Sequence, residues 1–170
     1  PLLLALVGYG AVGFVDDLSK LLARRSLGLK ARQKLVLQFG LALVVAWAAL
    51  SRVGPHLRVP FMEGLWTVPE WLYLLLAVGT LVGTANAVNI TDGLDGLAAG
   101  STAVAAITMG VVAYVLGYAD VAVFAAAMGG ACLGFAWFNA HPAQVIMGDT
   151  GALALGGALG AVALFTGTPL

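Results

Sequence analysis

The chain has 170 residues, of which 61% are hydrophobic and only 9% charged, and eight basic residues balance eight acidic ones. Soluble domains carry about 25% charged residues and need a polar surface, so the composition excludes an ordinary soluble domain. A net charge of zero also gives no indication of a nucleic-acid partner.

Apolar stretches separated by short polar segments predict about six membrane-spanning helices. The first stretch, residues 1–15, is shorter than the roughly 20 residues of a span, so we interpret it as the end of a truncated helix. A signal peptide is the alternative, but no basic segment precedes it. The predicted fold class is all-α, a multi-pass transmembrane helix bundle, with residues 1–170 forming a single transmembrane domain of a larger protein. The later helices are expected at about residues 35–51, 71–89, 97–117, 121–138 and 151–168.

The basic residues concentrate in the first connection between spans, residues 16–34. This connection holds Lys20, Arg24, Arg25, Lys30, Arg32 and Lys34. Cytoplasmic connections of membrane proteins are rich in lysine and arginine, so we expect residues 16–34 to face the cytoplasm. Alternation then places residues 52–70 outside and residues 90–96 and 139–150 on the cytoplasmic side.

The outer connection, residues 52–70, contains three prolines, at positions 55, 60 and 69. Proline lacks the backbone N–H that a helix interior needs, so this connection is not expected to be helical. The stretch Leu57–Met62 is a candidate extended segment.

Five of the eight acidic residues form three groups at the edges of apolar spans. They are Asp16 with Asp17, Asp92 with Asp95, and Asp149. Ionisable residues beside membrane spans are costly and are functional candidates. Because the predicted topology brings all three groups to the cytoplasmic side, the sequence predicts one metal and phosphate site there.

The first group, Asp16 and Asp17, is followed by Lys20. Adjacent carboxylates repel one another unless a cation or a proton intervenes. Lys20 lies about one turn further along and could pair with these carboxylates or with an anionic substrate. A solvated helix terminus is the simpler alternative.

The second group lies in residues 86–96, which combine amides, a hydroxyl, carboxylates and glycines. Asn89, Asp92 and Asp95 are spaced three apart, which could direct their side chains into one cavity if the turn is helix-like. One of the two aspartates could instead cap the next helix.

The third group, Asn139 to Asp149, directly precedes the last predicted helix. The positive end of that helix would stabilise an anion, whether a carboxylate or a phosphate. Thr150 is a candidate N-cap. We expect His141 to be a loop or interface residue rather than a metal ligand, because no second histidine is near it in the sequence.

Small residues within the spans are expected to allow close helix packing. Cys132, the only cysteine, lies within an apolar span and is expected to be a packing residue. The glycine groups are Gly8, Gly10 and Gly13; Gly129, Gly130 and Gly134; and Gly156, Gly157 and Gly160.

Three motifs occur in this order: GFVDD from residue 13, NAVNITDGLDGLAAG from residue 86, and FNAHPAQVIMGDTGALALGG from residue 138. Together with the basic GLKARQK at residues 28–34, they resemble the polyprenyl-phosphate N-acetylhexosamine-1-phosphate transferases over nearly the whole chain. The sequences NAVNITDGLDGLA and PAQV favour the branch that transfers phospho-N-acetylmuramoyl-pentapeptide. Sister enzymes that transfer phospho-GlcNAc share the aspartates and remain an alternative. A transporter fragment with intramembrane carboxylates is another.

The resemblance implies a Mg²⁺-dependent enzyme of the bacterial inner (cytoplasmic) membrane, with its active site facing the cytoplasm. It would transfer phospho-N-acetylmuramoyl-pentapeptide from UDP to undecaprenyl phosphate, forming lipid I and UMP in peptidoglycan synthesis. Partners are the UDP-sugar, the polyprenyl phosphate and membrane lipid, and a homodimer is left open.

The resemblance also implies roles for single residues. Asp149 resembles the metal ligand and, with Asp16 and Asp17, the catalytic residues. We favour direct attack with Asp16 as the base, and a covalent route stays open. The implied substrate contacts are Lys20, Lys34, Asn89, Asp92, Asp95, Asn139 and Ile146.

Two departures from the family pattern stand out. Ile146 replaces a phenylalanine, and an aliphatic side chain cannot stack on uracil as a ring does. The chain also stops at Leu170, before the histidine-rich motif of the family, so the fragment alone is expected to be inactive.

Overall fold

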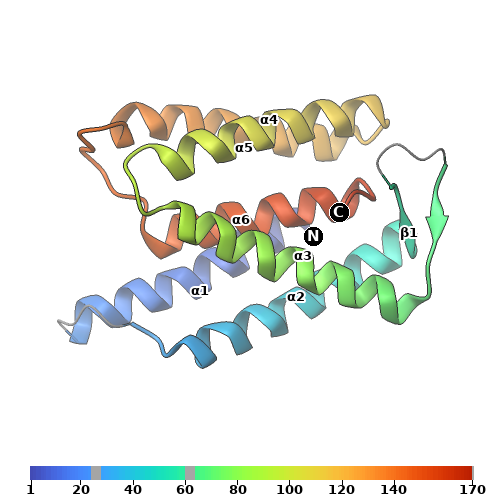
Figure 1. Ribbon diagram of the computed structural model, residues 1–170, viewed down its shortest axis with the longest axis horizontal. Helices are drawn as coiled ribbons and strands as arrows, with labels where there is room; N and C mark the ends of the chain where they lie inside the picture. The colour runs from blue at the N-terminus through green and yellow to red at the C-terminus, as the bar shows by residue number, and fades with distance from the viewer. Residues whose placement is uncertain (24–27, 60–63, 170) are drawn as a thin grey trace.

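The computed structural model describes residues 1–23, 28–59 and 64–169, and confirms the predicted all-α bundle (Figure 1). Within these ranges six helices are each long and apolar enough to cross a membrane, as expected for an integral membrane protein. The helices are α1 (Leu2–Ala23), α2 (Ala31–Val53), α3 (Glu70–Thr91), α4 (Leu97–Val115), α5 (Ala119–Asn139) and α6 (Gly148–Phe165).

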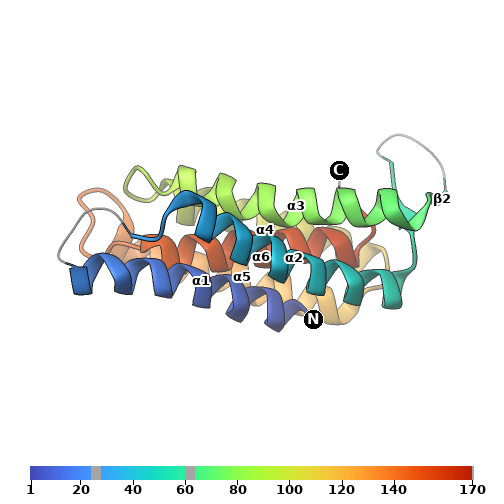
Figure 2. The same ribbon diagram turned by 90° about the horizontal axis from the view of Figure 1, so that it is seen from below.

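Helix α6 forms the centre of the bundle (Figures 1 and 2). It packs mainly against α1 and α3, while α4 and α5 pack against each other as a hairpin on the opposite side. The apolar window of α6 is 56% buried, against 28–39% for the other five described helices. A functional group at either end of α6 is therefore surrounded by several helices.

Glycines allow the central helix to approach its neighbours. A Cβ on Gly156 would lie 2.6 Å from the Ala85 Cα of α3, and one on Gly157 would lie 2.5 Å from the ring of Tyr9 in α1. These contacts confirm the close packing predicted for that glycine group. The prediction is wrong for Gly130 and Gly134, which have no neighbour within 4 Å in the described part of the chain.

The two ends of the bundle differ in character. A short antiparallel pair, β1 (His56–Leu57) with β2 (Trp66–Thr67), lies at one end. Exposed tryptophans occur near this end at positions 47, 66 and 71, as is typical of a membrane–water interface. The extended segment expected at Leu57–Met62 is confirmed at Leu57 but not at residues 58 and 59, which lie in no strand, and residues 60–62 lie outside the described residues. At the other end lie the end of α1 and the α3–α4 and α5–α6 connections, and the aspartate groups lie in or next to these segments (Figure 1).

The predicted boundaries of the first two helices are wrong at this end. Helix α1 has 22 residues and continues through Asp16, Asp17 and Lys20, which the sequence analysis placed in a loop. Lys20 pairs with Asp16 and Asp17 at spacings of four and three, so these charges stabilise the helical turn rather than end it. Helix α2 begins at Ala31, which places Lys34 in its first turn. Arg24 and Arg25 lie outside the described residues.

Candidate active site

Carboxylates from opposite ends of the sequence meet where α1 approaches the start of α6. Asp16, Asp17 and Asp149 each place an oxygen within 4.8 Å of the others. The close approach requires Gly13, because a Cβ there would lie 2.7 Å from the Thr150 Cα. The structure thus brings the first and third aspartate groups into one cluster.

Two lysines neutralise part of this charge. The Lys20 Nζ lies 2.6 Å from Asp16 Oδ2 and 3.0 Å from Asp149 Oδ2, and Lys34 Nζ lies 2.7 Å from the same Asp149 oxygen. Both ammonium groups therefore converge on Asp149, one from α1 and one from α2. Such groups can bind phosphate oxygens once a carboxylate releases them.

Asp16 is the most buried member of the cluster, with 3% exposure. Its Oδ1 accepts a hydrogen bond from the Leu29 N–H at 2.8 Å, and its Oδ2 faces Lys20. A Cβ on Gly28 would lie 2.6 Å from Oδ1 and 2.9 Å from the Asp16 carbonyl oxygen, so glycine lets the chain pass close to this carboxylate. Asp16 thereby ties the segment that leads into α2 to the site, and its role as the base stays a prediction.

Asp17 caps the central helix from outside. Its Oδ2 accepts hydrogen bonds from the Thr150 N–H at 2.9 Å and from the Thr150 hydroxyl at 2.7 Å. Helix α6 begins at Gly148, so Thr150 lies inside the first turn and the predicted N-cap role is wrong. Met147 occupies the N-cap position without a capping side chain, and Asp17 satisfies a first-turn amide in its place. Gly148 has a φ of 68° here, which favours glycine.

The end of α3 adds Asn89, in its last turn, and Asp92, its C-cap residue. The Asn89 Nδ2 donates to Asp149 Oδ1 at 2.8 Å, and the Lys34 Nζ donates to Asn89 Oδ1 at 3.4 Å. Asp92 lies beside Gly148, the first residue of α6. Burial, followed by the nearby charges of Asp149 and Asp17, raises the pKa of Asp92 above its ordinary value.

Asp95 and Asn139 lie outside this cluster and join two connections to each other. The Asp95 Oδ2 accepts hydrogen bonds from the Ala143 N–H and pairs with His141 Nδ1, both at 3.1 Å. The Ala143 amide, and then His141, lower the pKa of Asp95. The Asn139 Oδ1 accepts from the Gly96 N–H at 3.0 Å. Both residues therefore position the connections, and their expected contacts with substrate stay predictions.

The remaining expected residues are also placed. His141 lies in the α5–α6 connection rather than among the three clustered carboxylates, and Ile146 of the same connection is 80% exposed. Because Ile146 is so exposed, it does not pack between α5 and α6. Cys132 is buried, as expected.

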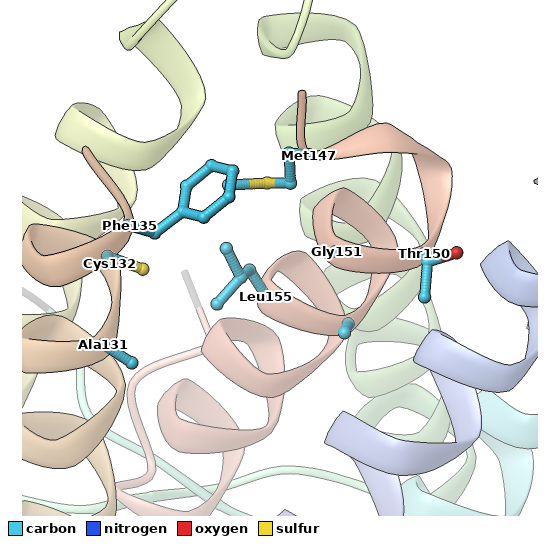
Figure 3. Close-up of a pocket in the computed structure, with 8 residues that line it drawn as sticks. Ala131, Cys132, Phe135, Met147, Thr150, Gly151 and Leu155 are labelled. Carbon is cyan, nitrogen blue, oxygen red and sulfur yellow. The ribbon is translucent and has the colours of Figure 1, made fainter. Parts of the chain in front are cut away.

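An apolar cavity of about 380 Å³ lies between α5 and α6 beside the cluster (Figure 3). Phe135 and Cys132 of α5 face Met147 and Leu155 across it. Thr150 forms part of its wall and directs its hydroxyl away from it, toward α1 (Figure 3). The polar chemistry therefore lies on the α1 side of Thr150.

The donor atoms of the cluster fit a divalent cation. Carboxylate oxygens are the protein ligands that Mg²⁺ prefers, and one or two carboxylates commonly hold it with phosphate oxygens and water. Asp149 and Asp17 are the less buried of the three clustered carboxylates and would hold it. A bound cation would neutralise the carboxylate charge that Lys20 now offsets.

Sequence reasoning missed the partners one turn deeper in the bundle. Gln38 and Asn86 are polar residues within apolar spans, and they hydrogen-bond to each other at 2.6 Å. Gln38 lies four residues from Lys34, and Asn86 three from Asn89, so their spacing could have indicated a shared helix face. The link between Asp17 and Thr150 has no comparable signal in the sequence.

The raised pKa of Asp92 leads to a prediction about stability. Its carboxyl binds a proton more tightly in the folded than in the unfolded protein, so ionised Asp92 destabilises the fold at neutral pH. This penalty is lost as the pH falls through the raised pKa toward about pH 4. We expect Asp92→Asn to melt at a higher temperature than the parent at pH 7, with a smaller difference at low pH. An unchanged or lower melting temperature at pH 7 would contradict the assignment.

Comparison with known proteins places the chain in a family. Residues 1–167 match glycosyl transferase family 4. The phospho-N-acetylmuramoyl-pentapeptide-transferases of Moorella thermoacetica and Geobacillus kaustophilus are each 50% identical to it, over 165 and 167 residues. That of Caldanaerobacter subterraneus subsp. tengcongensis is 47% identical over 169 residues.

These alignments cover 96%, 97% and 99% of this chain but only 52%, 51% and 53% of the respective relatives. The chain therefore spans about half the length of these curated relatives. The match to the family takes in all three aspartate groups, which confirms the resemblance recognised from the motifs. The chain belongs to glycosyl transferase family 4.

Proposed function

We propose that the full-length protein transfers phospho-N-acetylmuramoyl-pentapeptide from UDP to undecaprenyl phosphate, forming lipid I and releasing UMP. The observation that carries this proposal is the convergence of Lys20 and Lys34 on Asp149 at one end of the membrane bundle. The relatives at 47–50% identity are named for the transfer of phospho-N-acetylmuramoyl-pentapeptide, which supports the same reaction.

The geometry suits a reaction between two anions. A phosphate oxygen of the lipid must approach the pyrophosphate of the nucleotide, so positive charge and in-line positioning supply most of the catalysis. Lys20 and Lys34 would bind phosphate oxygens, while Asn89 orients Asp149. Three carboxylates outnumber these two ammonium groups, and Mg²⁺ held by Asp149 and Asp17 would supply the missing positive charge.

We also propose that the site faces the cytoplasm and that residues 1–170 belong to one transmembrane domain of a larger transferase. The site includes Lys20 and Lys34 of the segment 16–34, which holds six of the eight basic residues of the sequence, and this supports the orientation. There it can reach a soluble nucleotide and a membrane lipid together.

Release of UMP tests the proposed reaction. The full-length protein is incubated with undecaprenyl phosphate, Mg²⁺ and either UDP-MurNAc-pentapeptide or UDP-GlcNAc, and UMP is measured. We expect UMP and a lipid-linked product only with the muramoyl substrate. Turnover of UDP-GlcNAc alone would favour the sister reaction, and no UMP with either substrate would contradict both.

The transporter alternative is less well supported. Carboxylates that couple ion movement to transport lie near the middle of the membrane. Here Asp16, Asp17 and Asp149 lie where α1 ends and α6 begins. The bond from the Thr150 amide in the first turn of α6 to Asp17, and the pairing of all three carboxylates with lysine, favour phosphate chemistry.

The exposure of Ile146 sharpens a prediction about nucleotide binding. We expect Ile146→Phe in the full-length protein to tighten UMP binding by about 0.5–1.5 kcal/mol, the contribution of aromatic pairs beyond area burial. KM for the UDP-sugar should fall more than kcat changes, because stacking acts equally in the ground and transition states. The melting temperature should not change, since Ile146 is 80% exposed. Unchanged UMP affinity would place the uracil pocket elsewhere.

A further inference from the structure

A second polar layer lies directly beneath the site, inside the bundle. Gln38 of α2 is fully buried, and its Oε1 accepts a hydrogen bond from the Asn86 Nδ2 of α3 at 2.6 Å. The same Asn86 nitrogen donates to the Val82 carbonyl at 2.8 Å. The Tyr9 hydroxyl of α1 donates to the Gln38 backbone carbonyl at 3.3 Å. One residue thus links three helices.

Each member of this layer shares a helix face with a residue of the site. Gln38 follows Lys34 by four residues in α2, and Asn86 precedes Asn89 by three in α3. Residues three or four apart on a helix are neighbours on its surface. In the upper layer, Lys34 reaches both Asn89 and Asp149. The lower layer therefore joins the same two helices whose side chains meet at Asp149.

Stability alone does not explain a glutamine at this position. The Gln38 Nε2 is buried without a hydrogen-bond partner among the described residues, and such a group opposes folding. A leucine of similar size would avoid that penalty, and Asn86 would keep its bond to Val82. A leucine would not form the directional hydrogen bond between α2 and α3. That bond fixes the rotation of one helix, and its position along the axis, relative to the other.

We propose that Gln38 is a positioning residue whose amide bridge to Asn86 holds Lys34 against Asp149. Its effect on turnover rests on the proposed function, whereas its effect on Lys34 does not. The full-length protein carrying Gln38→Leu tests it. The matched control is Thr102→Val, because Thr102 of α4 is also buried and its hydroxyl also has no partner among the described residues.

We expect Gln38→Leu to lower kcat for UMP release by about 10- to 100-fold, the scale of a small misplacement of a catalytic group. The melting temperature should be equal to or higher than that of the parent in both Gln38→Leu and Thr102→Val, because each removes a buried polar group without a partner among the described residues, and Thr102→Val should leave kcat unchanged. In a Lys34→Met background, Gln38→Leu should cause no further loss, because it acts through Lys34. Additive losses would overturn the proposal.

Exchange of the two amides gives a further test of the bridge. Gln38→Asn and Asn86→Gln should each lower kcat, whereas the double variant keeps the combined side-chain length and should recover most of it. Failure of the double variant to recover activity beyond that of both single variants would count against the bridge. This comparison still tests the bridge if Gln38→Leu does not fold.

Chemical reactivity of Lys34 separates this proposal from the proposed function. Acetylation by acetic anhydride, measured by mass spectrometry, needs no substrate and no turnover. The Lys34 side chain is 16% exposed and paired in the parent, so it should react slowly, and Gln38→Leu should raise its rate severalfold. Unchanged Lys34 reactivity would overturn the positioning role even in an active enzyme. Faster reactivity in a protein that releases no UMP would support it while the proposed reaction fails.

Discussion

Asp149→Asn in the full-length protein is expected to reduce Mg²⁺-dependent UMP release by at least about 10²–10³-fold, comparable to the removal of a key charge-stabilising group. Asp149 accepts hydrogen bonds from Lys20, Lys34 and Asn89. An asparagine would remove the negative charge that gathers both ammonium groups, and its NH₂ group could not accept their hydrogen bonds. It would also remove the predicted ligand of the metal. UMP release is measured across a range of Mg²⁺ concentrations.

Asp120→Asn is the matched control. Asp120 is also an aspartate in the first turn of a helix, α5, which begins at the opposite end of the bundle. The control should retain the turnover and the Mg²⁺ dependence of the parent. Near-normal turnover in a folded Asp149→Asn protein would remove Asp149 from the site.

Gly13→Ala is expected to have the second-largest effect. The new Cβ would lie 2.5 Å from the Asp149 carbonyl carbon and 2.7 Å from the Thr150 Cα. Because these are backbone atoms, α1 must move away from α6, at a cost of about 1–3 kcal/mol in the free energy of unfolding. The same movement separates Asp17 from Thr150, and a displacement near 1 Å can cost about 10²-fold in turnover.

Gly134→Ala is the control for this change, because Gly134 has no neighbour within 4 Å in the described ranges. It shows how a glycine-to-alanine change in a membrane-spanning helix affects stability and turnover when the new Cβ meets no neighbour among the described residues. Melting temperature and UMP release are measured for both variants. Equal behaviour of the two variants would show that the approach of α1 to α6 is not critical.

Composition and apolar length were sufficient to predict five of the six spans, because a helix that crosses a membrane commonly leaves a stretch of about 20 uncharged residues. The first span was expected to be a truncated helix of residues 1–15, whereas α1 has 22 residues and is long enough to cross. The ends of the spans were less predictable. Asp16, Asp17 and Lys20 indicated a loop, yet their pairing at helical spacing extends α1 to Ala23. A charged residue ends an apolar stretch without ending the helix.

The site was predictable as a set of residue types but not as a set of contacts. Charge at the span edges indicated Asp16, Asp17, Asp92 and Asp149, which do converge. Asn89, Asp92 and Asp95 are spaced three residues apart, which suggested that all three face a common cavity. Asp95 instead bonds to His141 and Ala143. Contacts between segments more than a hundred residues apart, such as Asp17 with Thr150, depend on helix packing that local pattern does not contain.

Membrane sidedness of the aspartate segments tests the central claim most directly. In full-length protein with Cys132 and any cysteine outside residues 1–170 replaced by alanine, single cysteines replace Leu22, Ile90 and Ile146, which are exposed beside the three segments, and Leu65, exposed at the hairpin end. A membrane-impermeant maleimide is applied to sealed vesicles of each orientation. We predict labelling of the first three from the cytoplasmic side alone and of Leu65→Cys from the other side alone. Labelling of any one of the three only from the outer side would contradict a single site built from all three segments.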